Sequence, residues 1–172
     1  MMSSPRPASR RYLAPGITAA LLLSIAASAS AQSATRNAAP MISEQEPYGR
    51  YVTDREGHSL YLFEQDEPGS GISTCTDACA NAWPPYVTDE SPEAGEGIDA
   101  SKLGTIERDG GTKQVTYAGW PLYYFNGDKQ PGDALGQDVQ HLGAEWYLVS
   151  PEGQMIHQGG RTEADGENQD NQ

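Results

Sequence analysis

Two cysteines carry the most specific chemistry that this sequence could perform. Cys75 and Cys79 are the only cysteines of the chain and stand four residues apart. On a helix this spacing puts the two Cα atoms about 6 Å apart, which is within the range of a disulfide. Two thiolates one helical turn apart would also suit Cu(I). The spacing favours a disulfide, and it leaves a reversible thiol-redox pair and a copper site open.

A copper site would need further soft or imidazole ligands, and no other cofactor is expected. The candidates for a third ligand are His58, His141, His157, Met41 and Met155. His141 follows Cys79 by 62 residues, a spacing that recurs below. The sequence contains no Cys-x-x-Cys-His for covalent haem, and no nucleophile elbow, P-loop, HExxH or EF-hand pattern. We therefore predict no catalytic residue.

The first 31 residues are typical of an export signal. Arg6, Arg10 and Arg11 precede a short apolar run that ends at Ala29-Ser30-Ala31. A basic start, an apolar centre and an A-x-A site predict a secretory signal peptide over residues 1–31. The segment 9–13 also resembles part of a twin-arginine signal, so the export route stays open. We expect a periplasmic or secreted protein, without a lipid anchor because no cysteine lies near the cleavage site.

The acidity of the chain excludes several classes of protein. Removal of residues 1–31 takes away three arginines and no acidic residue, which changes the formal charge from −13 to −16. A surface this acidic repels phosphate, so we expect no nucleic-acid partner. No second apolar stretch is long enough to cross a membrane, so we expect no transmembrane segment in the mature chain. Outside the cytoplasm two cysteines tend to pair.

Composition divides the rest of the chain into three parts. Residues 32–46 lack periodicity and are expected to be a flexible linker, and residues 159–172 are expected to be a disordered acidic tail. Beyond the predicted signal peptide, every aromatic residue lies between Tyr48 and Tyr147. The folded domain is therefore predicted over 47–158, which is long enough for one modest core.

An internal repeat organises this domain into copies at about 48–87 and 110–150. The matched residues recur at a constant offset of 62: Gly57, Leu60, Tyr61, Phe63 and Asp66 correspond to Gly119, Leu122, Tyr123, Phe125 and Asp128. Each copy reads as a β-hairpin, with strands at 48–53 and 58–63 and at 112–117 and 120–125. Further strands are expected at 103–108, 145–149 and 153–157, and one helix at 73–83. The sequence predicts a mainly β, small antiparallel domain built from two related hairpins with one short helix.

The shared residues of the two copies allow more than one role. Tyr61 and Phe63 should face away from Leu60 and Leu62, so that both sides of this strand are covered. Asp66 and Asp128 either cap turns or offer a pair of carboxylates. Most aromatic rings are expected in the core, but Trp83, Trp120 and Trp146 could line a groove for sugars or peptides.

The two motif copies resemble a bacterial family. Tyr61-x-Phe63-x-x-Asp66 and Tyr123-x-Phe125-x-x-Asp128 resemble the signature of predicted lipoproteins with a Yx(F/W/Y)xxD motif, also called the secreted repeat of unknown function. The segments Cys75–Pro85 and Gln114–Tyr123 resemble the stretches around that signature. Many members carry a lipid-attachment cysteine, which this chain lacks. The resemblance implies export and a repeat fold, and it supplies no activity, cofactor or catalytic residue.

Together these features predict an exported, non-catalytic envelope protein. Its expected role is to bind a small ligand or an envelope partner whose identity the sequence does not give. The alternative is a periplasmic copper-handling or thiol-redox protein that uses Cys75 and Cys79.

Overall fold

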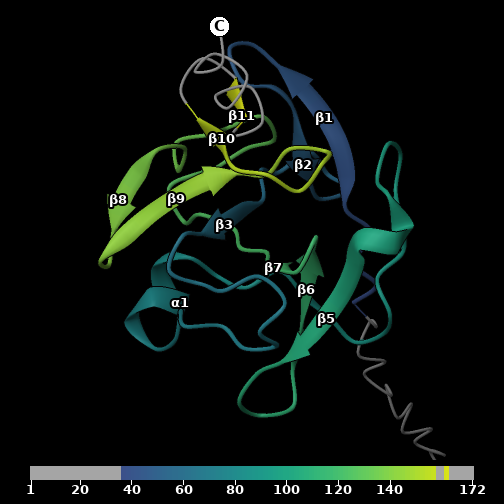
Figure 1. Ribbon diagram of the computed structural model, residues 1–172, viewed down its shortest axis with the longest axis vertical. Coiled ribbons are helices and arrows are strands. Elements are labelled where there is room, and N and C mark those ends of the chain that lie inside the picture. The colour runs from purple at the N-terminus through teal and green to yellow at the C-terminus, as the bar shows by residue number, and fades with distance from the viewer. Residues whose placement is uncertain (1–35, 158–160, 163–172) are drawn as a thin grey trace, which may run out of the picture. The chain divides into compact units, whose positions relative to one another are not determined.

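Figure 1 shows a computed structural model of the 172-residue chain, which describes residues 36–157 and 161–162. The predicted signal peptide 1–31 lies outside the described residues. The elements in chain order are β1 (Met41–Gln45), β2 (Gly49–Thr53), β3 (Tyr61–Phe63), α1 (Ala78–Ala82), β4 (Val87–Thr88), the 3₁₀ turn η1 (Ala100–Lys102), β5 (Leu103–Glu107), β6 (Lys113–Tyr117), β7 (Trp120–Pro121), β8 (Val139–His141), β9 (Ala144–Leu148), β10 (Ile156–His157) and β11 (Arg161–Thr162). No helix among them is long and apolar enough to cross a membrane.

Every strand pair between these elements is antiparallel. One sheet has the order β3-β9-β8, and a second has the order β4-β6-β5 with β7 also paired to β6. Two further pairs are β1-β2 and β10-β11. The first two sheets occupy separate sides of the view in Figure 1. The expected mainly β, antiparallel repeat fold with one short helix is confirmed.

The helix is shorter than the predicted segment 73–83. Residues 73–75 are held outside it by side chains: the Cys75 N–H donates to Ser73 Oγ, and the Thr74 N–H donates to Asp66 Oδ1. Side-chain acceptors of this kind compete with the helical bonds of the backbone. The regular helix therefore begins at Ala78, directly after Asp77, whose φ is +49°.

The flexible linker expected at 32–46 is wrong for the residues that the structure describes. β1 pairs with β2 over five residues, from Met41 opposite Thr53 to Gln45 opposite Gly49. Ala38 and Ala39 just before it are buried. β1 reads Met-Ile-Ser-Glu-Gln, which does not alternate between apolar and polar residues, so the sequence did not indicate this strand. Residues 161–162 of the expected disordered tail likewise pair with β10, while 158–160 and 163–172 lie outside the described residues.

Both copies form a hairpin, but only in the second copy is the pairing long enough to define two strands. β6 and β7 are joined by a tight turn, with Tyr117 opposite Trp120. In the first copy the pairing is limited to a bridge between Thr53 and Ser59, which is flanked by the hydrogen bond from the Leu60 N–H to the Val52 carbonyl. β3 pairs instead with β9 of the other copy. The two copies are therefore interleaved rather than placed side by side as separate hairpins.

The short strand β3 separates two hydrophobic clusters. Leu60 and Leu62 belong to one cluster, and Tyr61 and Phe63 belong to the other. All four side chains are buried. The expected alternation, with both sides of the strand covered, is confirmed.

Candidate functional site

The two copies of the motif meet at Tyr61 and Tyr123. The Tyr61 N–H donates to the Tyr123 carbonyl oxygen over 2.8 Å, and the Tyr123 N–H donates back over 2.9 Å. Both tyrosines are fully buried. Because the two residues occupy equivalent positions, this bridge lies where a two-fold axis relating the copies would pass.

Each motif tyrosine is hydrogen-bonded to the motif aspartate of the other copy. The Tyr61 hydroxyl donates to Asp128 Oδ2 over 2.7 Å, and the Tyr123 hydroxyl donates to Asp66 Oδ2 over 2.5 Å. Asp66 Oδ1 also accepts from the N–H and the hydroxyl of Thr74, and Asp128 Oδ1 accepts from the Leu135 N–H. Each carboxylate thus caps a turn in its own copy and binds a phenol of the other.

Burial governs the acid–base properties of these pairs. It raises the pKa of the Tyr61 and Tyr123 phenols well above the ordinary value, and the adjoining carboxylates raise it further. Burial also raises the pKa of Asp128, against the opposing effect of the Tyr61 hydrogen bond. Phenols held neutral against separate carboxylates serve as donors. The arrangement therefore joins the two copies and does not form a paired-carboxylate centre.

The turn glycines of the motif repeat the same exchange. The Gly69 N–H donates to the Gly119 carbonyl, and the Gly132 N–H donates to the Gly57 carbonyl, each over 3.0 Å. A Cβ on Gly119 would lie 2.7 Å from the Gly69 nitrogen, so this close approach requires glycine.

Four aromatic rings form a continuous stack beside the two tyrosines. Phe125 stacks on Trp83, Trp83 on Trp146, and Trp146 on Phe63, with centroid distances of 4.2, 3.9 and 4.2 Å. The two indole planes differ by only 1°. In both outer contacts the phenylalanine of one copy covers the tryptophan of the other. The stack therefore places Trp83 and Trp146 in the interior, as most aromatic residues were expected to be.

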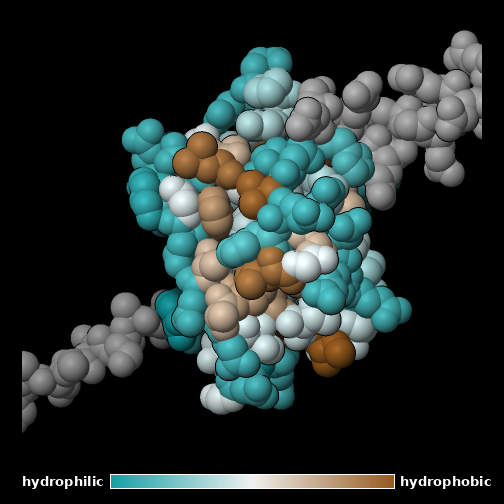
Figure 2. All heavy atoms as spheres, turned by 90° about the vertical axis from the view of Figure 1, so that its left-hand side faces the viewer, coloured by the Kyte–Doolittle hydropathy of each residue, from teal (hydrophilic) through white to brown (hydrophobic). Residues whose placement is uncertain are grey.

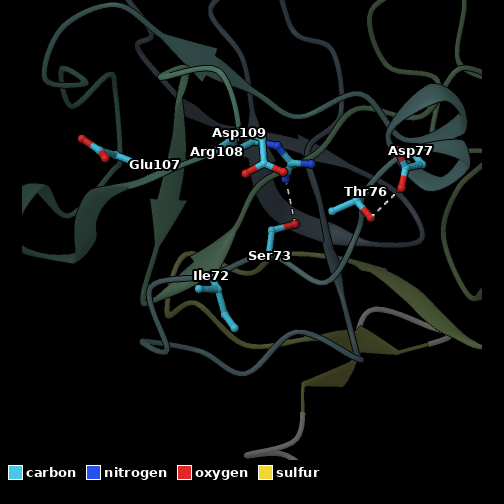
Figure 3. A pocket seen from close by; sticks show the side chains of 7 residues that line it. All are labelled: Ile72, Ser73, Thr76, Asp77, Glu107, Arg108 and Asp109. Carbon is cyan, nitrogen blue, oxygen red and sulfur yellow. Dashed lines mark hydrogen bonds between the residues drawn. The ribbon is translucent and has the colours of Figure 1, made fainter.

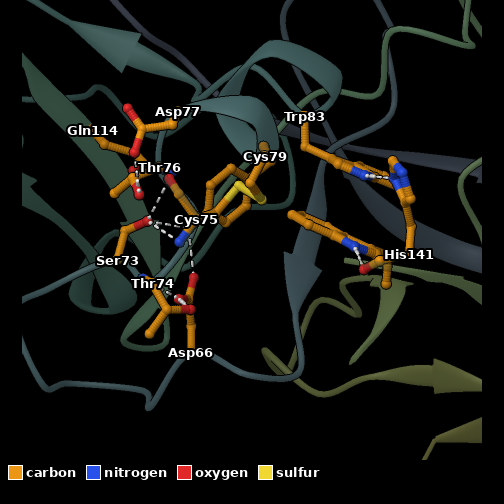
Figure 4. The surroundings of a disulfide bond; sticks show 12 residues. Asp66, Ser73, Thr74, Cys75, Thr76, Asp77, Cys79, Trp83, Gln114 and His141 are labelled. Atoms are coloured by element: carbon orange, nitrogen blue, oxygen red, sulfur yellow. Dashed lines mark hydrogen bonds between the residues drawn. A yellow bond between two sulfur atoms is a disulfide. The ribbon is translucent and has the colours of Figure 1, made fainter. Parts of the chain in front are cut away.

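The disulfide favoured by the cysteine spacing is present. Cys75 and Cys79 are bonded, with their Cα atoms 5.1 Å apart, and both residues are buried in the cluster that holds the indole stack. Figure 4 shows the bond beside Ser73 and Thr74 on one side and Trp83 on the other. Thiol–disulfide exchange requires access of an attacking thiolate to sulfur. Burial of both cysteines therefore favours a structural role for this bond.

The histidine candidates for copper are engaged elsewhere. His141 Nδ1 accepts a hydrogen bond from Trp83 Nε1 over 2.9 Å (Figure 4). His58 Nδ1 lies 3.3 Å from Asp54 Oδ2. His157 meets the ring of Tyr147 edge-on.

The methionine candidates are not in the hydrophobic cluster that contains Cys75 and Cys79 either. Met155 is buried in the cluster on the other side of β3, and Met41 opens β1. Within the described residues, no three or more His, Cys, Asp or Glu side chains are arranged to hold a metal.

Copper at Cys75 and Cys79 stays a prediction. Anaerobic Cu(I) titration of the reduced protein tests it: binding no tighter than that of a Cys75→Ser/Cys79→Ser variant would reject it.

A cavity of about 310 Å³ lies beside the disulfide loop, and Arg108 is the basic residue that lines it (Figure 3). Arg108 Nη1 donates to Ser73 Oγ and to Gln114 Oε1, each over 2.7 Å, and Nη2 donates to the Cys75 carbonyl. The guanidinium therefore stabilises the loop that contains Ser73 and Cys75. Asp77, Glu107 and Asp109 also line the cavity, so its acidic side chains outnumber its one basic side chain.

Two further, separate cavities have Tyr124 in common as a lining residue, and we call this pair of cavities the Tyr124 groove. One, of about 370 Å³, is lined by Asp54, His58, Ser59, Pro84, Tyr124, Phe125, Asn126 and Asp128. The other, of about 280 Å³, is lined by Arg36, Asn37, Ala38, Ala39, Arg55, Glu56, Pro85, Tyr86, Val87 and Tyr124. Residues 36–39 and both copies contribute to this groove. The sequence did not indicate it, because only Phe125 and Asp128 belong to the repeated motif and residues 32–46 were expected to be a flexible linker.

Tyr124 is fixed within the groove by its neighbours. Its hydroxyl donates to Asp54 Oδ2 over 3.0 Å, and its ring meets Tyr86 edge-on at 5.4 Å. Asp54 Oδ1 accepts from the N–H groups of Glu56 and His58. Burial raises the pKa of Tyr86 to about 12 and raises that of Tyr124 further, so both phenols are neutral donors at physiological pH.

The family model described as a secreted repeat of unknown function matches residues 44–87 and 104–150. The two matched segments contain the two motif copies and the strands that interleave them. The chain belongs to this family. No curated protein and no solved structure matches the chain. The resemblance seen in the motif residues is thus confirmed for this secreted repeat protein, and the family description supplies no activity.

Proposed function

We propose that this secreted repeat protein is a non-catalytic binding module of the bacterial periplasm or cell exterior, and that the Tyr124 groove takes its ligand. The observation that carries the proposal is the contrast between the buried motif residues and the partly exposed residues of the groove, to which the motif contributes only Phe125 and Asp128. The motif tyrosines and Asp66 are buried and bonded to one another, so they hold the fold. The groove instead gathers partly exposed rings and polar groups from three segments of the chain.

The composition of the groove favours a hydroxyl-rich ring ligand, a saccharide. Pro84, Pro85, Tyr124 and Phe125 are partly exposed and supply flat apolar faces. Planar polar groups stand around them: the amides of Asn37 and Asn126, the imidazole of His58, and the guanidinium groups of Arg36 and Arg55. Rings with a few convergent hydrogen-bonding groups are the usual lining of a small-molecule site.

The surface elsewhere gives less support to an apolar protein partner. Figure 2 shows that the face on the left of Figure 1 is mainly hydrophilic, with separate hydrophobic patches. Among the described residues, the large hydrophobic side chains that are exposed are Ile72, Leu135 and Leu142. Scattered exposed apolar residues are ordinary on a monomer and do not mark an interface.

Titration of the isotope-labelled mature protein with N-acetylglucosamine oligosaccharides tests this proposal by NMR. We expect concentration-dependent shifts of amides that line the groove, centred on Tyr124 and Asn126. The Arg55→Ala and Tyr124→Ala variants should weaken the response. Glu107→Ala, in the Arg108 cavity, is the matched control and should not.

The experiment distinguishes a wrong binding site from a wrong ligand class. Shifts outside the groove, or shifts that are unchanged in Tyr124→Ala, would reject the groove as the site. A folded protein with no shift at any saccharide concentration would reject the ligand class.

A further inference from the structure

The indoles of Trp83 and Trp146 are stacked and parallel to within 1°. The rings lie 3.9 Å apart, and both residues are fully buried. Phe125 and Phe63 cover the outer faces of the pair. When one of two stacked indoles loses an electron, the positive charge, or hole, can be shared between both rings. Burial of the two rings keeps water away from that charge. We propose that this indole pair is a one-electron redox site and that His141 is its proton acceptor.

The two indole N–H groups have different acceptors. Trp83 Nε1 donates to the Nδ1 of His141, whereas Trp146 Nε1 donates to the backbone carbonyl of His141 over 3.2 Å. Removal of an electron makes an indole N–H strongly acidic. An imidazole nitrogen can take that proton and a carbonyl oxygen cannot, so the proton leaves from Trp83.

His141 is suited to pass the proton onward. It is the last residue of β8, directly before the turn to β9, and it is exposed. When Nδ1 accepts, a neutral imidazole carries its own proton on Nε2. Transfer to Nδ1 followed by release from Nε2 therefore delivers the proton of a buried indole to solvent. The imidazole supplies this route without exposing either tryptophan.

The hole could also be transferred from the indole pair to the motif tyrosines. Tyr61 meets Trp83 edge-on at 5.5 Å, and Tyr123 meets Trp146 at 5.2 Å. Each phenol donates to a carboxylate, Asp128 or Asp66, which can hold the phenolic proton when the ring is oxidised. The pair therefore lies between two further oxidisable rings, each with its own proton acceptor.

The external oxidant in this reaction is a peroxyl radical, and the external reductant is a quinol. A peroxyl radical takes one electron from the indole pair and one proton from solvent and becomes a hydroperoxide. The Trp83 N–H proton passes to His141, whose Nε2 proton enters solvent, and a neutral indolyl radical remains. A quinol restores the indole by supplying one electron and one proton and becomes a semiquinone, and two semiquinones disproportionate to a quinol and a quinone. The overall result is transfer of one hydrogen atom from the quinol to the peroxyl radical, which leaves the protein unchanged.

Flash-quench oxidation tests this site with photogenerated ruthenium(III) tris-bipyridine as the one-electron oxidant. The protein carries Trp120→Phe, so that all indole signals arise from Trp83 and Trp146. Transient absorption separates the indole radical cation from the neutral indolyl radical. We expect the neutral radical to form rapidly in this protein, and more slowly in heavy water.

The decisive variant is His141→Gln, because a glutamine oxygen accepts the same hydrogen bond without acting as a base. Loss of a positioned base should slow formation of the neutral radical by about 10²-fold and let the radical cation accumulate. His157→Gln, which removes an imidazole away from the stack, should change neither rate. Near-UV circular dichroism of each variant checks that the indole packing is retained.

Equal rates of neutral-radical formation with and without the His141→Gln substitution would overturn the role of the imidazole. A Trp83→Phe variant with an undiminished yield of neutral radical would overturn the assignment of the site. This test uses no saccharide, so its result is independent of the proposed binding function.

Discussion

Replacement of the motif tyrosines by phenylalanine should destabilise the protein unequally. Tyr123 donates to Asp66, which is only 3% exposed, whereas Tyr61 donates to Asp128, which is half-buried. Hydrogen bonds to charged groups contribute about 1.5–3 kcal/mol, and a buried acceptor left without its donor also loses solvation. We expect Tyr123→Phe to cost about 2–3 kcal/mol and Tyr61→Phe about 1 kcal/mol, since water can reach Asp128.

Urea unfolding of the oxidised protein, followed by far-UV circular dichroism, measures both costs. A double-mutant cycle of Tyr123→Phe with Asp66→Asn isolates the pairwise energy, and the cycle of Tyr61→Phe with Asp128→Asn is its internal control. The coupling energy should be larger for the first pair. If Tyr61→Phe costs as much as Tyr123→Phe, then burial of the acceptor does not decide the strength of these contacts, and our reasoning fails.

Three other predictions concern stability. Gly119→Ala should cost more than Gly110→Ala: both glycines have a φ of +86°, but only the first would place its Cβ against backbone, so urea midpoints should separate the two. The Cys75→Ala/Cys79→Ala variant should lose about 2 kcal/mol by the same assay, because the bond closes a short loop, and an unchanged midpoint would contradict this. Stability should also fall as the pH rises above 10.0, since buried phenols keep protons in the folded state that the unfolded chain releases. Unfolding midpoints across alkaline pH, with tyrosinate absorbance, measure this for Tyr61, Tyr123 and Tyr124.

The fold was predictable wherever large side chains alternate or recur. Tyr61 and Phe63 are spaced as on a strand covered on both sides, and that is what the two clusters around β3 show. β1 was not predictable, because backbone pairing and the small side chains of Ala38 and Ala39 hold its segment in place. Partner choice was also hidden: each copy contains a hairpin pattern, but nothing in that pattern says that β3 pairs with β9.

The candidate site was predictable only in part, for a related reason. The cysteine spacing indicated a disulfide because both residues lie within one turn of chain. The indole stack and the Tyr124 groove depend on contacts between residues far apart in sequence, such as Trp83 with Trp146. Spacing within a motif carries no information about such contacts.

The exchange of contacts between the copies constrains how the sequence can change. A tyrosine of one copy depends on an aspartate of the other, and the same holds for the turn glycines and for the phenylalanine–tryptophan contacts. The two copies behave as the subunits of a symmetric dimer carried on one chain, joined by the segment 88–103, which keeps each at a high local concentration for the other. Removal of either copy would leave the hydrogen-bonding groups and stacked rings of the other without their partners, so the pair is the smallest unit that can fold as this structure does.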